Sequence, residues 1–151
     1  MPFYTKIDQI EKNEPGKGKR IASNLLKLKN LLDEGNDDPS SKNYSAPIPK
    51  KTLEDTLLLA SWNIREFDSL SFGSRSDESM LYIAEIISRF DLVAIQEIKR
   101  DMGVLKRLVG FLGSYWKFVV TDETLGTGGN RERLAFFYDS RKIKFTGLTG
   151  E

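Results

Sequence analysis

Two apolar runs, each closed by a polar residue, constrain the fold of this chain more than any other feature of its sequence. Residues 57–63 and 91–97 are mostly apolar and end in Asn63 and Glu97. Short continuous runs of this kind are typical of buried strands in a parallel sheet. Between them, residues 80–90 carry apolar side chains at helical spacing. The order strand, helix, strand predicts an α/β domain whose early strands are parallel.

The rest of this domain continues the alternation of helices and strands. We predict a second helix, a third strand and a closing hairpin in residues 102–112, 115–120, and 134–138 with 143–145. Polar, glycine-containing loops are predicted in residues 69–77 and 126–131.

The first 51 residues differ in character from the rest. Within residues 19–34 four apolar side chains share one helix face, and Gly35 is a plausible stop. Residues 36–50 hold three prolines with Ser, Asn and Asp, which predicts a linker. We therefore divide the chain into an N-terminal extension, residues 1–51, and a main domain, residues 52–151. The four apolar side chains of the helix are Ile21, Leu25, Leu28 and Leu32.

Two roles are open for this amphipathic helix. A one-sided apolar stripe usually faces a core, so the helix would dock its stripe on the main domain. Alternatively, its lysines would contact nucleic acid or an anionic membrane surface.

Composition narrows the class of protein. The chain has 151 residues, enough for one domain with a core of its own. Its net charge of +1 predicts no strong bulk attraction to nucleic acid. Without cysteine it has no disulfide framework and no thiolate metal site. It has no apolar run of the ~20 residues needed to span a bilayer and no apolar signal segment. These features predict a cytoplasmic protein.

Asn63 and Glu97 are suited to bind ligands. In parallel α/β sheets, ligands bind beyond the carboxyl ends of the strands, where both residues are predicted to lie. A carboxylate is a suitable Mg²⁺ ligand, and an amide beside it can hold a metal-bound water or a phosphate oxygen. Gln96 adds a polar group, although strand alternation points it to the opposite face. The alternative is that Asn63 caps a strand and Glu97 is merely solvated.

A glycine-bearing loop brings Arg131 and Arg133 to the start of the next predicted strand. Guanidinium groups bind phosphate through paired, charge-assisted hydrogen bonds. The alternative is that both arginines only protect an edge of the sheet.

Three segments in this order resemble the first half of the endonuclease/exonuclease/phosphatase superfamily, and most closely its deoxyribonuclease I type. The segments are residues 61–67 (Ser-Trp-Asn-Ile-Arg-Glu-Phe), 89–98 (Arg-Phe-Asp-Leu-Val-Ala-Ile-Gln-Glu-Ile) and 130–138 (Asn-Arg-Glu-Arg-Leu-Ala-Phe-Phe-Tyr). The resemblance extends from about residue 52 to the end. It implies half of a four-layer α/β/β/α sandwich, with a mixed sheet flanked by helices.

The resemblance also implies a function. It identifies Glu97 as a ligand of Mg²⁺ or Mn²⁺ and Asn63 as an organiser of the metal and the scissile phosphate. Arg133 would contact a phosphate or support the site, while Arg131 is a weaker match. The implied activity is metal-dependent phosphodiester hydrolysis. Similarity to the deoxyribonuclease I type favours DNA over RNA, inositol phosphates or lipid headgroups as the substrate.

The chain lacks part of what this activity requires. In the family, histidines and further Asp and Asn residues from the second half assist the attack, and this chain has no histidine. We therefore expect it to be inactive, or nearly so, on its own. We also expect an uncovered apolar sheet face, marginal stability, and association through that face with a second copy or a missing C-terminal half. The alternative function is a non-enzymatic module that binds phosphates or a partner.

Overall fold

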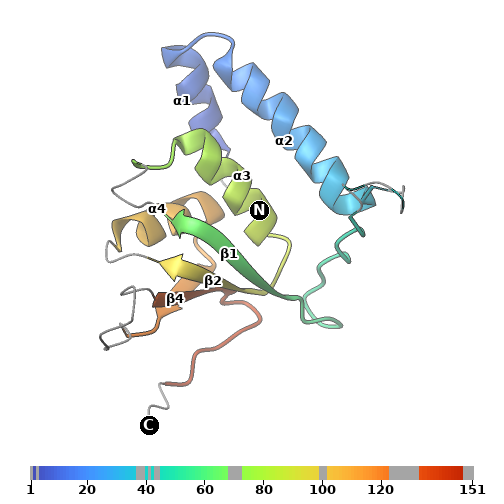
Figure 1. Cartoon of the computed structure of the whole chain (residues 1–151), viewed down its shortest axis with the longest axis vertical. Helices are drawn as coiled ribbons and strands as arrows, with labels where there is room; N and C mark the ends of the chain where they lie inside the picture. The colour runs from blue at the N-terminus through green and yellow to red at the C-terminus, as the bar shows by residue number, and fades with distance from the viewer. Residues whose placement is uncertain are drawn as a thin grey trace.

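The computed structural model describes residues 2, 4–36, 40, 42, 45–67, 73–98, 102–122 and 133–147. Within these ranges the helices are α1 (Thr5–Asn13), α2 (Lys17–Glu34), α3 (Asp77–Ile87) and α4 (Gly103–Leu112). The strands are β1 (Leu59–Phe67), β2 (Leu92–Ile98), β3 (Trp116–Val120) and β4 (Arg133–Asp139) (Figure 1). The predicted alternation of strands and helices in the main domain is confirmed. The predicted loop at residues 126–131 lies outside the described residues, as do parts of residues 36–50 and 69–77.

The strands form one mixed sheet in the order β1-β2-β4-β3. β1 and β2 are parallel, and β4 is antiparallel to both β2 and β3. The strands β1, β2 and β3 therefore run in the same direction, and their carboxyl ends lie at the same end of the sheet. The fold is of the predicted α/β class with a mixed sheet.

The predicted strand at residues 143–145 is wrong. Both edges of β4 are already paired, one with β2 and one with β3, so the following segment has no free edge of β4 to join. A turn also redirects the chain, because the amides of Lys142 and Ile143 both donate to the carbonyl oxygen of Asp139 at 3.0 Å.

Helix α3 begins three residues earlier than the apolar spacing predicts. Ser76 caps it, with its side-chain oxygen accepting a hydrogen bond of 3.2 Å from the amide of Ser79. Asp77 and Glu78 in the first turn add favourable interactions with the helix dipole. Polar capping residues therefore extend this helix beyond its apolar stripe.

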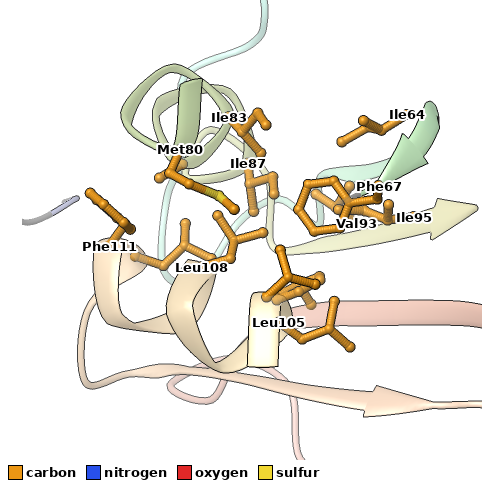
Figure 2. Packing of buried hydrophobic residues seen from close by; sticks show 14 of the residues in the cluster. Ile64, Phe67, Met80, Ile83, Ile87, Val93, Ile95, Leu105, Leu108 and Phe111 are labelled. Atoms are coloured by element: carbon orange, nitrogen blue, oxygen red, sulfur yellow. The ribbon is translucent and has the colours of Figure 1, made fainter. Parts of the chain in front are cut away.

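Helices α3 and α4 pack on one face of the sheet and form the main core. Figure 2 shows side chains of α3, such as Met80 and Ile87, and of α4, such as Leu108, pointing toward Val93 and Ile95 of β2. These residues belong to a single cluster of buried apolar side chains.

The N-terminal helices form a hairpin that packs on the outer side of α3 (Figure 1). Ile21 and Leu25 of α2 are buried in the same cluster as the sheet core. At the rim, the Arg20 guanidinium makes two hydrogen bonds of 2.7 Å to the Glu78 carboxylate. The predicted docking of the apolar stripe is confirmed for Ile21 and Leu25, whereas Leu28 and Leu32 are half-buried and lie outside this cluster. The boundary at residue 52 stays a prediction.

The opposite face of the sheet has no helical cover among the described residues. Leu59 on β1 is 60% exposed and Leu134 on β4 is 39% exposed. Ala94 and Phe136, which are paired between β2 and β4, are half-buried on the same face. The expected apolar, incompletely covered sheet face is therefore present.

Within the described part of the chain, no helix is both long and apolar enough to cross a membrane.

Candidate functional site

An open cleft of about 440 Å³ lies where the carboxyl ends of β1, β2 and β3 meet the start of β4. All three site residues predicted from the sequence line it, each from a different strand. They are Asn63 of β1, Glu97 of β2 and Arg133 of β4. Arg131, the weaker candidate, lies outside the described residues. The remaining lining residues are Gln96, Thr121, Asp122 and Leu134.

Asn63 reaches the cleft because it stands on the uncovered face of the sheet. Its side chain is exposed, like those of Leu59 and Ser61 on the same strand, whereas Ile64 is buried. Asn63 pairs with Gln96 across β1 and β2, so two amide side chains are neighbours at the mouth of the cleft. Such a pair offers oxygen acceptors and N–H donors without adding charge.

A bulge at the end of β2 positions Glu97. The pairing of β2 with β4 shifts between Ile95 and Ile98, and the pairing with β1 shifts over the same stretch. Ile95 and Ile98 are buried, while Gln96 and Glu97 between them are both partly exposed and both line the cleft. A bulge inserts one extra residue, which breaks the alternation of faces. The expectation that alternation turns Gln96 away from the site of Glu97 is therefore wrong.

The backbone of Glu97 adopts a left-handed conformation, with φ of 60°. Within the described residues it is the only residue other than glycine with a positive φ. This conformation costs a residue with a Cβ atom about 1–2 kcal/mol, and it persists only where the surrounding structure imposes it. Strain of this kind concentrates at functional sites, and here it falls on the carboxylate predicted to bind a metal.

Gln96 and Arg133 are each held by a neighbouring side chain. The side-chain nitrogen of Gln96 donates a hydrogen bond of 3.2 Å to the hydroxyl of Ser61. Arg133 pairs with Ile98 across β4 and β2, and its Nη1 lies 3.7 Å from the sulfur of Met102, just before α4. These contacts orient both side chains at the rim of the cleft.

Thr121 and Asp122, which were not among the residues predicted from the sequence, follow β3 and form the third wall of the cleft. The amide of Thr121 donates to the carbonyl oxygen of Leu134, and the amide of Leu134 donates to the Thr121 hydroxyl, both at 3.0 Å. The sequence feature that pointed to Asn63 and Glu97 was a polar residue directly after an apolar run. Thr121 and Asp122 have the same feature, because they directly follow the apolar end of β3.

The lining residues that the structure describes carry charges of both signs. Glu97 and Asp122 carry two carboxylates against the single guanidinium of Arg133, which leaves a net charge of −1 among the described lining residues.

The donor set fits a magnesium-type ion. Such ions keep several waters and take only one or two carboxylates from the protein, together with oxygens of the substrate. Glu97 supplies one carboxylate and Asn63 an amide oxygen in the same cleft. Among the described residues, no cluster of three or more His, Cys, Asp or Glu side chains offers a fully protein-built metal site.

The sequence of the chain is similar to known proteins across the region that forms the cleft. A sequence model of the Endonuclease/Exonuclease/phosphatase family matches residues 60–149, a range that includes every lining residue of the cleft. A protein named deoxyribonuclease from Thioalkalivibrio sp. (strain K90mix) is 30% identical over 103 residues. That match covers 66% of this chain but spans only 27% of the length of the relative.

Proposed function

Because this chain belongs to the endonuclease/exonuclease/phosphatase family, we propose that its cleft holds the cation and the substrate phosphate of a metal-dependent phosphodiesterase acting on DNA. The meeting of Asn63, Glu97 and Arg133 in one cleft carries this proposal. The name of the Thioalkalivibrio relative, a deoxyribonuclease, favours DNA as the substrate. The proposal includes the cytoplasmic location expected from the lack of cysteine.

The proposed roles follow from the chemistry of each side chain. Glu97 holds the cation, Mg²⁺ or Mn²⁺, and its strained backbone aims the carboxylate into the cleft. Asn63 orients the cation and the scissile phosphate without adding charge, and Arg133 binds a phosphate oxygen. When bound, the cation neutralises charge on the phosphate and polarises the phosphoryl group.

The cleft has no histidine, the side chain that most often transfers protons at neutral pH. Positioned acids and bases typically contribute ~10²–10⁴-fold to such reactions. We therefore propose that the chain alone binds DNA in the presence of the cation but cleaves it slowly or not at all.

A binding experiment tests this proposal directly. A short, fluorescently labelled DNA duplex with phosphorothioate linkages, which resist cleavage, is titrated with the protein in Mg²⁺ and in EDTA. We expect Mg²⁺ to increase the affinity and Glu97→Ala to abolish that increase. Glu54→Ala, an exposed site before β1 at the opposite end of the sheet, is the control with the same loss of charge. A Mg²⁺ effect that survives Glu97→Ala would contradict the proposal.

Plasmid nicking tests the activity of the chain itself. We expect little or no nicking in Mg²⁺ by the wild-type chain or by Glu97→Ala. Robust nicking that Glu97→Ala abolishes would show that the chain needs no histidine, and that it is active by itself.

The uncovered sheet face supports a second candidate function, the binding of another polypeptide. Leu59 and Leu134 expose apolar surface on this face, and exposed apolar patches mark interaction sites. We propose that a second copy of the chain, or the remainder of a family domain, covers it. Sedimentation equilibrium should show self-association that Leu59→Lys weakens. Leu26→Lys, which changes an exposed leucine on α2, is the matched control.

A further inference from the structure

We propose that Ser61 holds the side-chain amide of Gln96 so that the amide oxygen, Oε1, accepts a hydrogen bond from a water of the hydrated cation in the cleft. This inference rests on the proposed function and gives roles to two residues that have none in it. Gln96 acts on the water of the cation, and Ser61 acts through Gln96 as a positioning residue.

The pairing of β1 with β2 places Gln96 between the cleft and Ser61. Asn63 is opposite Gln96 in this parallel pairing, and Ser61 is opposite Ala94. Residues two apart on a strand share a face, so Ser61 and Asn63 both lie on the side of the sheet that Gln96 occupies. Asn63 and Gln96 line the cleft, whereas Ser61 is not among its described lining residues. The Ser61 hydroxyl therefore contacts Gln96 from outside the cleft.

The contact between Ser61 and Gln96 uses the nitrogen of the amide. Nε2 of Gln96 donates a hydrogen bond of 3.2 Å to the Ser61 hydroxyl. A side-chain amide carries its donor nitrogen and its acceptor oxygen on opposite sides of one carbon atom. Within the part of the chain that the structure describes, no group donates a hydrogen bond to Oε1. Gln96 thus keeps an acceptor for a ligand of the cleft.

A hydrated cation favours this orientation of the amide. Mg²⁺ keeps several of its waters when it binds to a protein, and these waters donate hydrogen bonds outward. Gln96 is the pairing partner of Asn63 and the chain neighbour of Glu97, the two residues proposed to bind the cation. A positive ion attracts the oxygen of an amide and repels its N–H groups. Ser61 accepts one of those N–H groups and so stabilises the orientation that leaves Oε1 to the cation.

The expected benefit of Ser61 is preorganisation. A free glutamine side chain has several rotatable bonds, and ordering it on binding costs conformational entropy. The hydrogen bond to Ser61 restricts Gln96 before the cation arrives. Because this bond is exposed and water replaces it in part, its loss should weaken cation binding only moderately.

Binding of Mn²⁺, followed by the electron paramagnetic resonance signal of the free ion, tests this inference without measuring catalysis. Binding in the cleft is defined as the binding that Glu97→Ala removes. We expect Ser61→Ala and Gln96→Ala each to weaken it about twofold to fivefold. Ser61→Thr keeps the hydroxyl and should bind Mn²⁺ like wild type. Ser23→Ala, at an exposed residue of α2, is the matched control and should have no effect.

A double-mutant cycle tests whether Ser61 acts through Gln96. In the Gln96→Ala background, Ser61→Ala should weaken Mn²⁺ binding no further. An additional loss in that background would overturn the positioning role of Ser61. Affinities are compared at a temperature at which the melting curve of every variant shows it to be folded.

Three further outcomes are distinguishable. If Gln96→Ala leaves Mn²⁺ binding unchanged but weakens DNA binding in EDTA, the amide donates to a phosphate and the inference is wrong. If Glu97→Ala removes Mn²⁺ binding but neither Ser61→Ala nor Gln96→Ala weakens it, the inference fails alone. If wild type and Glu97→Ala bind Mn²⁺ equally, the cleft holds no cation, and the proposed function fails together with this inference.

Discussion

Thr121 and Leu134 are joined by two hydrogen bonds of 3.0 Å, one of which uses the Thr121 side chain. The pair lies immediately beyond the β3–β4 ladder and next to Arg133, so it ties the third wall of the cleft to the arginine proposed to bind phosphate. The side-chain bond satisfies the amide of Leu134 at a point where regular strand pairing has ended.

Thr121→Val should remove that side-chain bond while keeping the shape of the residue. Because Leu134 is exposed and water can replace the lost acceptor, we expect a loss of only about 0.5–1 kcal/mol in the free energy of unfolding. The affinity for DNA in Mg²⁺ should fall a few-fold, because Arg133 is less well positioned. Urea unfolding and the duplex titration measure the two effects. Thr121→Ser keeps the hydroxyl and should retain both stability and affinity.

The positive φ of Glu97 predicts an unusual order of stabilities. In most strand positions glycine is less stable than alanine, but at φ of 60° alanine carries the steric cost and glycine does not. We therefore expect Glu97→Gly to be more stable than Glu97→Ala by about 0.5–1 kcal/mol, measured by urea unfolding. Both variants should lose the Mg²⁺ effect on DNA binding.

The preceding residue provides the control for this prediction. Gln96 has no positive φ, so Gln96→Gly should be less stable than Gln96→Ala. The same order at both positions would show that the backbone at Glu97 is not strained.

The sequence predicts those site residues that stand next to an apolar run of the chain. Apolar runs correctly predict that Asn63 and Glu97 lie on two parallel strands, because the burial of such runs requires a sheet with covered strands. The predicted strand end at Asn63 is wrong, since β1 continues to Phe67, whereas Glu97 does lie next to the end of β2. The loop before the next strand indicates Arg131 and Arg133, and the resemblance to a family favours Arg133. The bulge at Glu97 is not predictable in this way, because no glycine marks the positive φ and the shift depends on pairing with two neighbouring strands.

Other features depend on tertiary contacts that no single segment encodes. Helix α1 has few apolar residues, so its sequence alone does not indicate a helix that packs on the domain. In the structure, Tyr4, Ile7 and Ile10 pack against the core. Asp122 follows an apolar strand as Glu97 does, but its relation to the cleft depends on the position of β3 at the far edge of the sheet.

Two adjacent leucines of α2 test the docking of the N-terminal helices. Leu25 is 4% exposed and packs in the core, while Leu26 is 61% exposed. Leu25→Ala should lower the free energy of unfolding by about 2–4 kcal/mol, and Leu26→Ala by less than about 0.5 kcal/mol. Thermal and urea unfolding measure both. Similar effects of the two substitutions would mean that the helix does not dock by this face.

A cluster of buried charges holds the end of the sheet opposite the cleft, and it predicts the acid sensitivity of the fold. Asp91 and Asp139 are fully buried; Lys142 Nζ lies 2.9 Å from Asp91, and Lys51 Nζ lies 3.0 Å from Asp139. Burial raises the pKa of Asp139, but hydrogen bonds from Arg141 and Lys51 outweigh it and hold that pKa well below its ordinary value. The pKa of Asp91 is also lowered, because bonds from the Leu58 amide and Lys142 outweigh its burial.

The sign of the pH dependence follows from these shifts. A carboxyl group with a lowered pKa in the folded state contributes stability above its ordinary pKa of 3.8, and that contribution is lost as pH falls toward the folded value. Near neutral pH, Asp139→Asn should cost about 3 kcal/mol, because it removes the buried carboxylate that pairs with the partly exposed cations of Lys51 and Arg141. Below pH 3.8 the gap to wild type should narrow by up to about 1.4 kcal/mol per pH unit. Urea unfolding across this range measures the gap, with Asp55→Asn as the exposed control. A gap that stays constant as pH falls would show that Asp139 does not stabilise the fold through its charge.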